Sequence, residues 1–227
     1  MPLFPLIPLL CALLLALLSW QAATDGPVRS LDERFGHWLA DGSLPSPAAQ
    51  FFADLGNVAV ALPVLVLALA YAAWRGRRVR APRWWLPPLA AALAMAAVPA
   101  LVVPLKTWID RPGPPRMAGG VHEGFFPSGH AATAAVAYGA AVLLLQYARE
   151  RPRTPRLWLF IAYGLLNAAV GVGLVRQGYH WPLDVVGAWC LAGLVLWCLH
   201  RVLLIGPRPG PALPPPRASR APGPPGP

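Results

Sequence analysis

Six long apolar runs, separated by short polar segments, dominate the pattern of this chain. Each run is close to the roughly 20 residues that an α-helix needs to cross the hydrocarbon core of a bilayer. Several runs contain Pro or Gly, which membrane-spanning helices tolerate when neighbouring helices satisfy the freed backbone groups. The pattern therefore predicts an all-α, polytopic membrane protein built as a bundle of six transmembrane helices. The predicted spans are Leu6 to Ala22, Asn57 to Trp74, Trp84 to Leu105, Ala131 to Ala148, Leu157 to Val175 and Val185 to Ile205.

The composition agrees with a membrane protein, since 56% of the residues are hydrophobic, only 12% are charged and the mean hydropathy is +0.50. The net charge of +10 raises nucleic acid as a partner. However, the arginines fall in short blocks between apolar runs rather than among aromatic residues on one face. Membrane orientation explains these blocks better, so the bilayer is the predicted partner and nucleic acid is not. The cysteines, which lie inside apolar runs without metal-ligand spacing, are interpreted as packing residues.

Four regions follow from these runs. Residues 1–23 form the first transmembrane helix, and residues 57–205 form a core of five more spans. A cleaved signal peptide is the alternative for residues 1–23, because Ala22-Ala23 resembles a small-residue cleavage site. A retained helix is favoured, because no Lys or Arg precedes it and other spans follow. Residues 206–227 are rich in Pro without apolar periodicity, which predicts a disordered cytoplasmic tail.

The segment from 24 to 56 is predicted to be an extracytoplasmic loop with an amphipathic helix. Ser30 to Glu33 offers a capping box at its start. Ser46-Pro47 predicts a second helix start, with Ser as N-cap and Pro at the first helical position. The apolar residues of the first helix follow at helical spacing, which suits a helix lying on the membrane surface. These residues are Leu31, Phe35, Trp38 and Leu39.

Charge predicts the orientation, because short loops rich in Lys and Arg stay in the cytoplasm. Arginines cluster at 75–83, between the second and third spans, and again at 149–156, between the fourth and fifth. Further arginines follow the sixth span. All of these lie on one side of the predicted topology, so both termini are expected in the cytoplasm of a multi-pass cell-membrane protein.

The opposite, extracytoplasmic side receives the polar segments from Lys106 to His130 and from Arg176 to Asp184. Pro127-Ser128-Gly129-His130 stands where an apolar run begins. A Ser at an N-cap, a Gly that lets a ligand approach the backbone and a titratable His in the first turn form a plausible anion site.

Cations accompany this loop. Lys106, Arg111 and Arg116 supply donors suited to phosphate, and Arg can bind in a bidentate fork. The alternative is that they only flank a span and reach toward the interface. Cations are otherwise scarce on this side, which favours phosphate binding by Lys106 and Arg111, with Arg116 left open between the two readings.

The second polar segment places His180 four residues before Asp184, with Pro182 between them. If Pro182 lies in a first helical turn, the carboxylate lies near the imidazole. Such a carboxylate fixes the His tautomer and makes the other ring nitrogen a better nucleophile or base. The alternative is a His-Trp pair that anchors the helix at the interface, with Asp184 facing the helix dipole.

Together these residues resemble the type-2 phosphatidic acid phosphatase superfamily, which carries the motifs K-x6-R-P, P-S-G-H and S-R-x5-H-x3-D. The second motif is intact at 127–130, and the third is intact in its latter half as His180-x3-Asp184. The first begins with Lys106 and has Arg111-Pro112. Two family arginines are absent, since their positions are Gly113 and Leu174. Arg111 or Arg116 is the candidate to replace the arginine missing at Gly113, and Arg176 the one missing at Leu174.

The resemblance implies a phosphatase that acts on a lipid phosphate or polyprenyl diphosphate. His180 would be the nucleophile that forms a phosphohistidine, Asp184 would orient it, and His130 would be the general acid. Lys106, Arg111, Ser128, Gly129 and Arg176 would bind the phosphate. No metal or other cofactor is implied, and no particular oligomeric state is predicted. The competing interpretation is a noncatalytic lipid-phosphate-binding membrane protein with a degenerate site.

Overall fold

The computed structural model describes residues 6–24, 26–117, 124–148 and 157–205. Helices and connecting loops make up these ranges, and no strand occurs within them. The helices are α1 (Leu6–Ala23), α2 (Pro27–Ala40), α3 (Ser46–Asp54), α4 (Val58–Arg78), α5 (Leu86–Ile109), α6 (Gly129–Tyr147), α7 (Leu157–Arg176) and α8 (Pro182–Ile205), with a 3-10 turn at Pro115–Met117.

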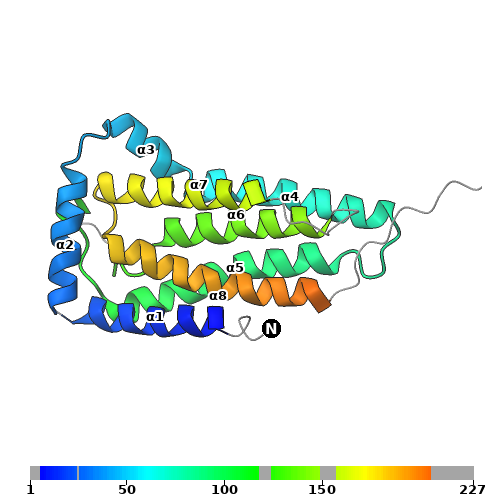
Figure 1. Ribbon diagram of the computed structural model, residues 1–227, viewed down its shortest axis with the longest axis horizontal. Coiled ribbons are helices and arrows are strands. Elements are labelled where there is room, and N and C mark those ends of the chain that lie inside the picture. Colours follow the sequence, from blue (N-terminus) through cyan, green and yellow to red (C-terminus); the bar gives the residue numbers. More distant parts are fainter. Residues whose placement is uncertain (1–5, 25, 118–123, 149–156, 206–227) are drawn as a thin grey trace, which may run out of the picture.

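The six helices α1 and α4 to α8 are long and apolar enough to cross a membrane, and they run side by side as a bundle (Figure 1). The prediction of an all-α protein with six membrane-spanning helices is therefore confirmed. The observed spans differ from the apolar runs mainly at their polar ends. Helix α5 continues to Ile109 and helix α8 begins at Pro182, so both extend into the segments that carry the candidate chemistry.

Helix α6 lies at the centre of the bundle, where it packs against α4, α5, α7 and α8. Its first three turns consist mostly of buried alanines, with Thr133 and Tyr138 among them. Small side chains let neighbouring helices approach closely, which is how helices associate inside a bilayer. The central position of α6 places its first residues, the Gly129-His130 pair, at the meeting point of the surrounding helices.

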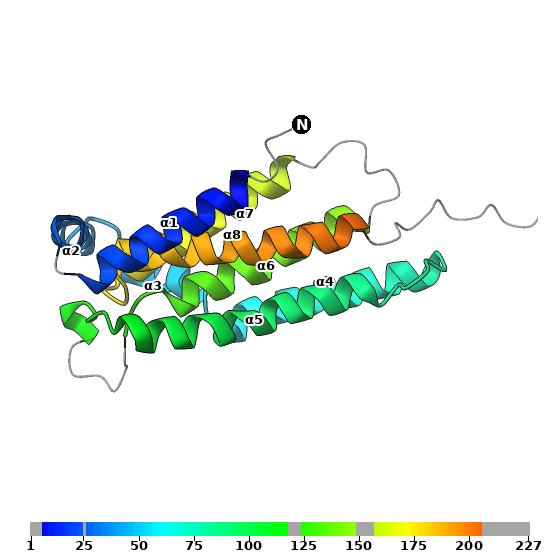
Figure 2. The same cartoon turned by 90° about the horizontal axis from the view of Figure 1, so that it is seen from below.

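Helix α2 lies across one end of the bundle, roughly at right angles to the long helices (Figures 1 and 2). Leu31, Phe35 and Trp38 on this helix are exposed, whereas Asp32 and Gly36 are buried. A helix thus forms in this segment with apolar residues on its exposed side, but the predicted capping box is wrong. The helix begins at Pro27 with Gly26 as N-cap, because Pro is well suited to the first helical turn and extends the helix upstream of Ser30.

Helix α3 is a separate short helix that packs against α7. It begins at Ser46 itself, with Pro45 at the N-cap and no side-chain cap, so the predicted N-cap is wrong by one residue. The chain then breaks, and Asn57 caps α4 by accepting a hydrogen bond from the Ala59 N–H at 3.1 Å.

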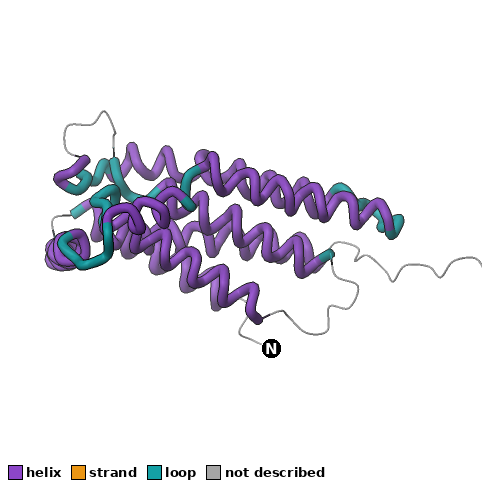
Figure 3. Tube along the Cα trace, turned by 90° about the horizontal axis from the view of Figure 1, so that it is seen from above, coloured by secondary structure: helices purple, strands orange, loops and turns teal. Residues whose placement is uncertain are grey.

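Most of the loops lie at one end of the bundle, the end that α2 crosses (Figure 3). The opposite end carries the α4–α5 connection with its arginines, and the first residues of α1 and the last residues of α8 point the same way (Figure 1). The other end carries α2, α3 and the loops that precede α6 and α8. The predicted arginine-rich loop at 149–156 and the predicted disordered tail at 206–227 lie outside the described residues.

Candidate active site

The start of α8 brings a histidine and a carboxylate together. Because the helix begins at Pro182, His180 lies just before it and Asp184 lies in its first turn. His180 Nδ1 is 3.2 Å from Asp184 Oδ2, which also accepts the Trp181 N–H at 3.0 Å. The predicted pairing is confirmed. With Nδ1 directed to the carboxylate, Nε2 is the ring nitrogen that remains for chemistry.

The Pro-Ser-Gly-His loop is attached directly to this pair. Ser128 is the N-cap of α6, and its Oγ accepts the Ala131 N–H at 3.3 Å. Its own N–H donates to the Asp184 carbonyl at 2.9 Å, so the starts of α6 and α8 are fixed against each other. A Cβ on Gly129 would meet no atom within 4 Å, which leaves the space over that backbone open. The first N–H groups of a helix have no carbonyl partner one turn earlier, so an open helix start suits an anion.

Lys106 reaches the same region from the end of α5. Its Nζ donates to the Gly124 carbonyl at 3.3 Å and lies 5.7 Å from the centroid of the Phe125 ring. The same ring has its centroid 5.7 Å from that of His180. Phe125 therefore contacts both Lys106 and His180, and all three motif segments converge at this end of the bundle.

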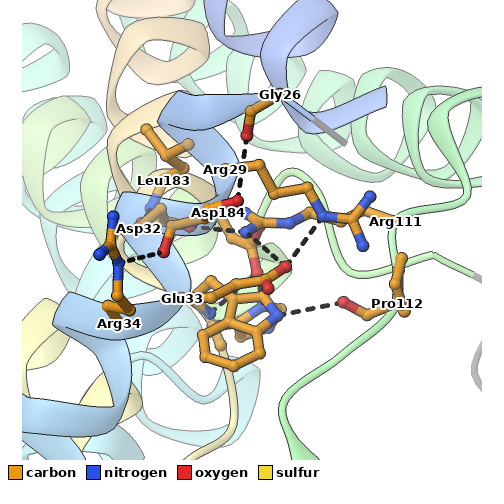
Figure 4. A network of polar contacts seen from close by, with 12 residues as sticks. Gly26, Arg29, Asp32, Glu33, Arg34, Arg111, Pro112, Leu183 and Asp184 are labelled. Carbon is orange, nitrogen blue, oxygen red and sulfur yellow. Dashed lines mark hydrogen bonds and ion pairs between the residues drawn. The ribbon is translucent and has the colours of Figure 1, made fainter. Parts of the chain in front are cut away.

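Arg111 takes a different place from the one expected. Its Nη1 donates to Asp184 Oδ1 at 2.7 Å and its Nη2 donates to Asp32 Oδ2 at 2.6 Å (Figure 4). The residue is only 1% exposed. Both terminal nitrogens thus donate to carboxylates, one to Asp184 of the His180-Asp184 pair and the other to Asp32 of α2. This geometry does not fit the expected role of Arg111 as a phosphate ligand.

Asp32 is a site residue that sequence reasoning missed. Its Oδ1 accepts the Leu183 N–H of α8 at 2.8 Å, while Oδ2 accepts from Arg111. Burial raises the pKa of the Asp32 carboxyl above its ordinary value, and the contacts with Arg111 and Leu183 oppose this shift only in part. The sequence around Asp32 indicated only a helix start, and no local pattern pointed to α8.

Arg116 and Arg176 lie at the rim of the site. Arg116 Nη1 donates to the Gln177 carbonyl at 2.9 Å and to Gln177 Oε1 at 2.7 Å. Arg176 donates from Nε to the Leu44 carbonyl at 3.0 Å and from Nη1 to the Ala40 carbonyl. Both arginines line a cavity of about 270 Å³ beneath α2, and His180 forms part of the same wall. They lie near His180, but each also donates hydrogen bonds to neighbouring loop residues.

The two positions that lack the family's arginines have physical explanations. A Cβ at Gly113 would lie 2.5 Å from the Phe125 ring, so the ring occupies the space that a side chain would need. Leu174 is 1% exposed and belongs to the apolar core of the bundle. Neither position can carry an arginine toward the site without rearrangement.

A second, larger cavity opens beside the site. It has a volume of about 690 Å³ and lies between α4, α5 and α6. Lys106, Gly129 and His130 line its polar end. Apolar side chains continue it along the spans, among them Leu62, Leu65, Leu69, Met95 and Val102. From residue 57 to residue 69 the rise along α4 is about 18 Å, so the groove extends well into the membrane-spanning part of the bundle.

Comparisons with known proteins match the part of the chain that carries the motif residues. The sequence profile of the PAP2 superfamily matches residues 87–205, a range that holds all three motif segments. Phosphatidylglycerophosphatase B of Bacillus subtilis (strain 168) is 35% identical over 97 residues, which are 42% of this chain and 47% of that protein. Undecaprenyl-diphosphatase of Sulfolobus acidocaldarius is 35% identical over 83 residues, 36% of this chain and 35% of that protein. The matched segments therefore span half or less of these relatives.

A solved structure is similar over most of the chain. It is described as the crystal structure of the first transmembrane PAP2 type phosphatidylglycerolphosphate phosphatase from Bacillus subtilis. The TM-score is 0.71 at 26% sequence identity, and the match covers 86% of this chain and 94% of the other. The similarity thus includes the helices that lie outside the range of the family profile.

Proposed function

The chain belongs to the PAP2 superfamily, and from this premise we propose that it is a membrane-bound phosphatase that hydrolyses a lipid phosphate or polyprenyl diphosphate. The observation that carries the proposal is the groove between α4, α5 and α6. Its polar end is lined by Lys106 and His130, and its remaining walls are apolar and lie within the spans. A ligand with a phosphate at one end and a hydrocarbon chain at the other fits this division.

The proposed reaction proceeds in two steps. His180 Nε2 attacks phosphorus, and the bond from phosphorus to the leaving oxygen breaks. His130 donates a proton to that oxygen, which leaves as the alcohol of a phosphate monoester or as the polyprenyl monophosphate of a diphosphate. Water then attacks the phosphohistidine while His130 takes a proton from it. The P–N bond breaks, phosphate is released and His180 regains its lone pair.

The surrounding groups are assigned to charge stabilisation. Asp184 supports the cationic form of His180, since its Oδ2 lies 3.2 Å from Nδ1. Lys106 and the start of α6 at Ser128 and Gly129 are the proposed ligands of the phosphate oxygens, where charge grows in the transition state. Arg116 and Arg176 supply positive charge from the rim. The site is proposed to face away from the cytoplasm, because the arginines of the α4–α5 connection lie at the opposite end.

A substrate panel in the presence of a metal chelator tests the proposal. Purified protein is expected to release phosphate from at least one of phosphatidic acid, phosphatidylglycerophosphate and undecaprenyl diphosphate. Activity without divalent metal is expected because, in the part of the chain that the structure describes, no three His, Cys, Asp or Glu side chains form a metal-ligand group. Binding of these lipids without release would favour the noncatalytic alternative, for which the missing arginines at Gly113 and Leu174 are the argument.

Lys106→Gln is expected to lower kcat/KM by about 10²-fold, because it removes the cation nearest the polar end of the groove. The measurement is the initial rate of phosphate release from the preferred lipid over a range of substrate concentrations. Lys106→Arg, which keeps the charge, is the matched control and should retain more activity than Lys106→Gln. Equal kcat/KM values for wild type and Lys106→Gln would remove Lys106 from the site.

A further inference from the structure

Helix α2 contacts the bundle through one narrow face, and that face carries a charge. Asp32 and Gly36, one turn apart, are its buried residues, Leu39 at its end packs partly against the core, and Leu31, Phe35 and Trp38 are exposed. Gly36 permits close contact, since a Cβ there would lie 2.7 Å from the Trp181 ring. A helix that only had to dock would bury apolar side chains. The buried carboxylate on this face therefore needs a different explanation.

The contacts of Asp32 lead to the nucleophile by two routes. The first passes through Arg111, which donates to Asp32 at 2.6 Å and to Asp184 at 2.7 Å. The second is direct, because Oδ1 accepts the Leu183 N–H in the first turn of α8, one residue before Asp184. Asp184 in turn lies 3.2 Å from His180 Nδ1. We infer that Asp32 is a positioning residue that, from α2, fixes Asp184 and through it the nucleophile His180.

The charge balance supports this inference. Arg111 is buried, and its Nε has no hydrogen-bond partner among the described residues, so Asp32 and Asp184 make its short contacts, at 2.6 and 2.7 Å, while Glu33 lies farther away at 3.9 Å. Shared between them, Arg111 engages Oδ1 of Asp184 and leaves Oδ2 for His180. Without the charge of Asp32, Arg111 would lose the shorter of its two hydrogen-bonded ion pairs and shift relative to Asp184.

Stability alone does not account for the carboxylate. Burial raises the pKa of Asp32, so the ionised form is held in the folded protein against a desolvation cost. Buried ion pairs are often neutral or unfavourable compared with well-packed apolar residues of similar size. A geometry-setting role gives a reason for placing the charge there. The competing explanation is a clamp that only attaches α2 to the bundle.

The test compares wild type with Asp32→Asn, which keeps the shape and removes the charge. The inference rests on the proposed phosphatase function, so the wild-type protein must first show His180-dependent phosphate release. If it shows none, the proposed function is refuted, and this result is distinguishable from a failure of the role inferred for Asp32. With active wild type, kcat per folded molecule is expected to fall by about 10-fold at nearly unchanged KM, because small misplacements of reacting groups are costly. Asp41→Asn, an exposed carboxylate at the end of the same helix, is the matched control and should behave as wild type.

Measuring kcat and the unfolding temperature of the same variant separates the positioning role from the clamp. A clamp without a positioning role predicts a lower unfolding temperature with wild-type kcat in the molecules that remain folded, and this result would overturn the inference. If Asp32→Asn does not fold, Asp32→Glu is measured instead. Its carboxylate is one methylene longer and cannot keep both short contacts, so a reduced kcat is expected and a wild-type kcat contradicts the inference. Failure of both variants to fold would also decide for the clamp.

Discussion

His180→Ala is expected to abolish phosphate release from every lipid that the wild-type protein hydrolyses, with a loss in kcat of roughly 10³-fold or more. The reason is chemical rather than structural. In the proposed mechanism His180 supplies the atom that bonds to phosphorus, and its Nδ1 lies 3.2 Å from Asp184 Oδ2. Alanine removes the nucleophile and leaves the helix start at Pro182 unchanged. The measurement is steady-state phosphate release under saturating lipid.

A second readout identifies the intermediate. Brief reaction with radiolabelled substrate, followed by an alkaline quench, should leave label on the wild-type protein and none on His180→Ala. A P–N bond survives alkali and is lost in acid, which distinguishes phosphohistidine from a phosphate ester. His200→Ala is the matched control, because His200 lies on the same helix near its opposite end and lines a different cavity. Label on the His180→Ala protein, or undiminished turnover, would exclude His180 as the nucleophile.

The sequence predicted those features of the site that depend on residues close together in the chain. The spacing of His180 and Asp184 around Pro182 indicated their contact, because a helix that starts at Pro182 brings the two side chains to one side. The N-cap role of Ser128 was also visible, since Ser before an apolar run is a strong helix start signal. The six spans followed from hydrophobicity alone, because the bilayer sets their length.

The partners of Arg111 could not be predicted in the same way. The sequence gives the charge of Arg111 but not the identity of the carboxylates that it contacts. Asp32 lies 79 residues from Arg111 along the chain. Asp32 also belongs to the segment from Ser30 to Glu33, which the sequence alone explains as a capping box at a helix start. Only the docking of α2 across the end of the bundle shows that this carboxylate reaches α8 (Figure 4).

The family's missing arginines were likewise visible from sequence, whereas their causes were not. Gly113 is explained by the Phe125 ring that fills the neighbouring space, and Phe125 belongs to the segment that precedes α6. The same ring lies against Lys106 and His180. Phe125 thus takes the space that a side chain at position 113 would need and also contacts Lys106 and His180, an arrangement that depends on three segments meeting in the fold.

His130→Asn is expected to lower kcat for lipid substrates by about 10³-fold, within the range typical of general acid catalysis. Its position at the start of α6, at the polar end of the apolar groove, places it where the leaving oxygen of a lipid would lie. A lipid alkoxide is a poor leaving group and needs a proton. An aryl phosphate such as p-nitrophenyl phosphate has a weakly basic leaving group and does not.

The two substrates therefore separate the role of His130 from a general loss of activity. With the aryl phosphate, His130→Asn should form the phosphohistidine at a rate close to that of wild type. Labelled protein should then accumulate, because the variant lacks the base that activates water in the second step. With the lipid, the first step itself should be slow and little label should appear. Equal loss with both substrates in the first step would contradict the assignment of His130 as general acid and would point instead to phosphate binding.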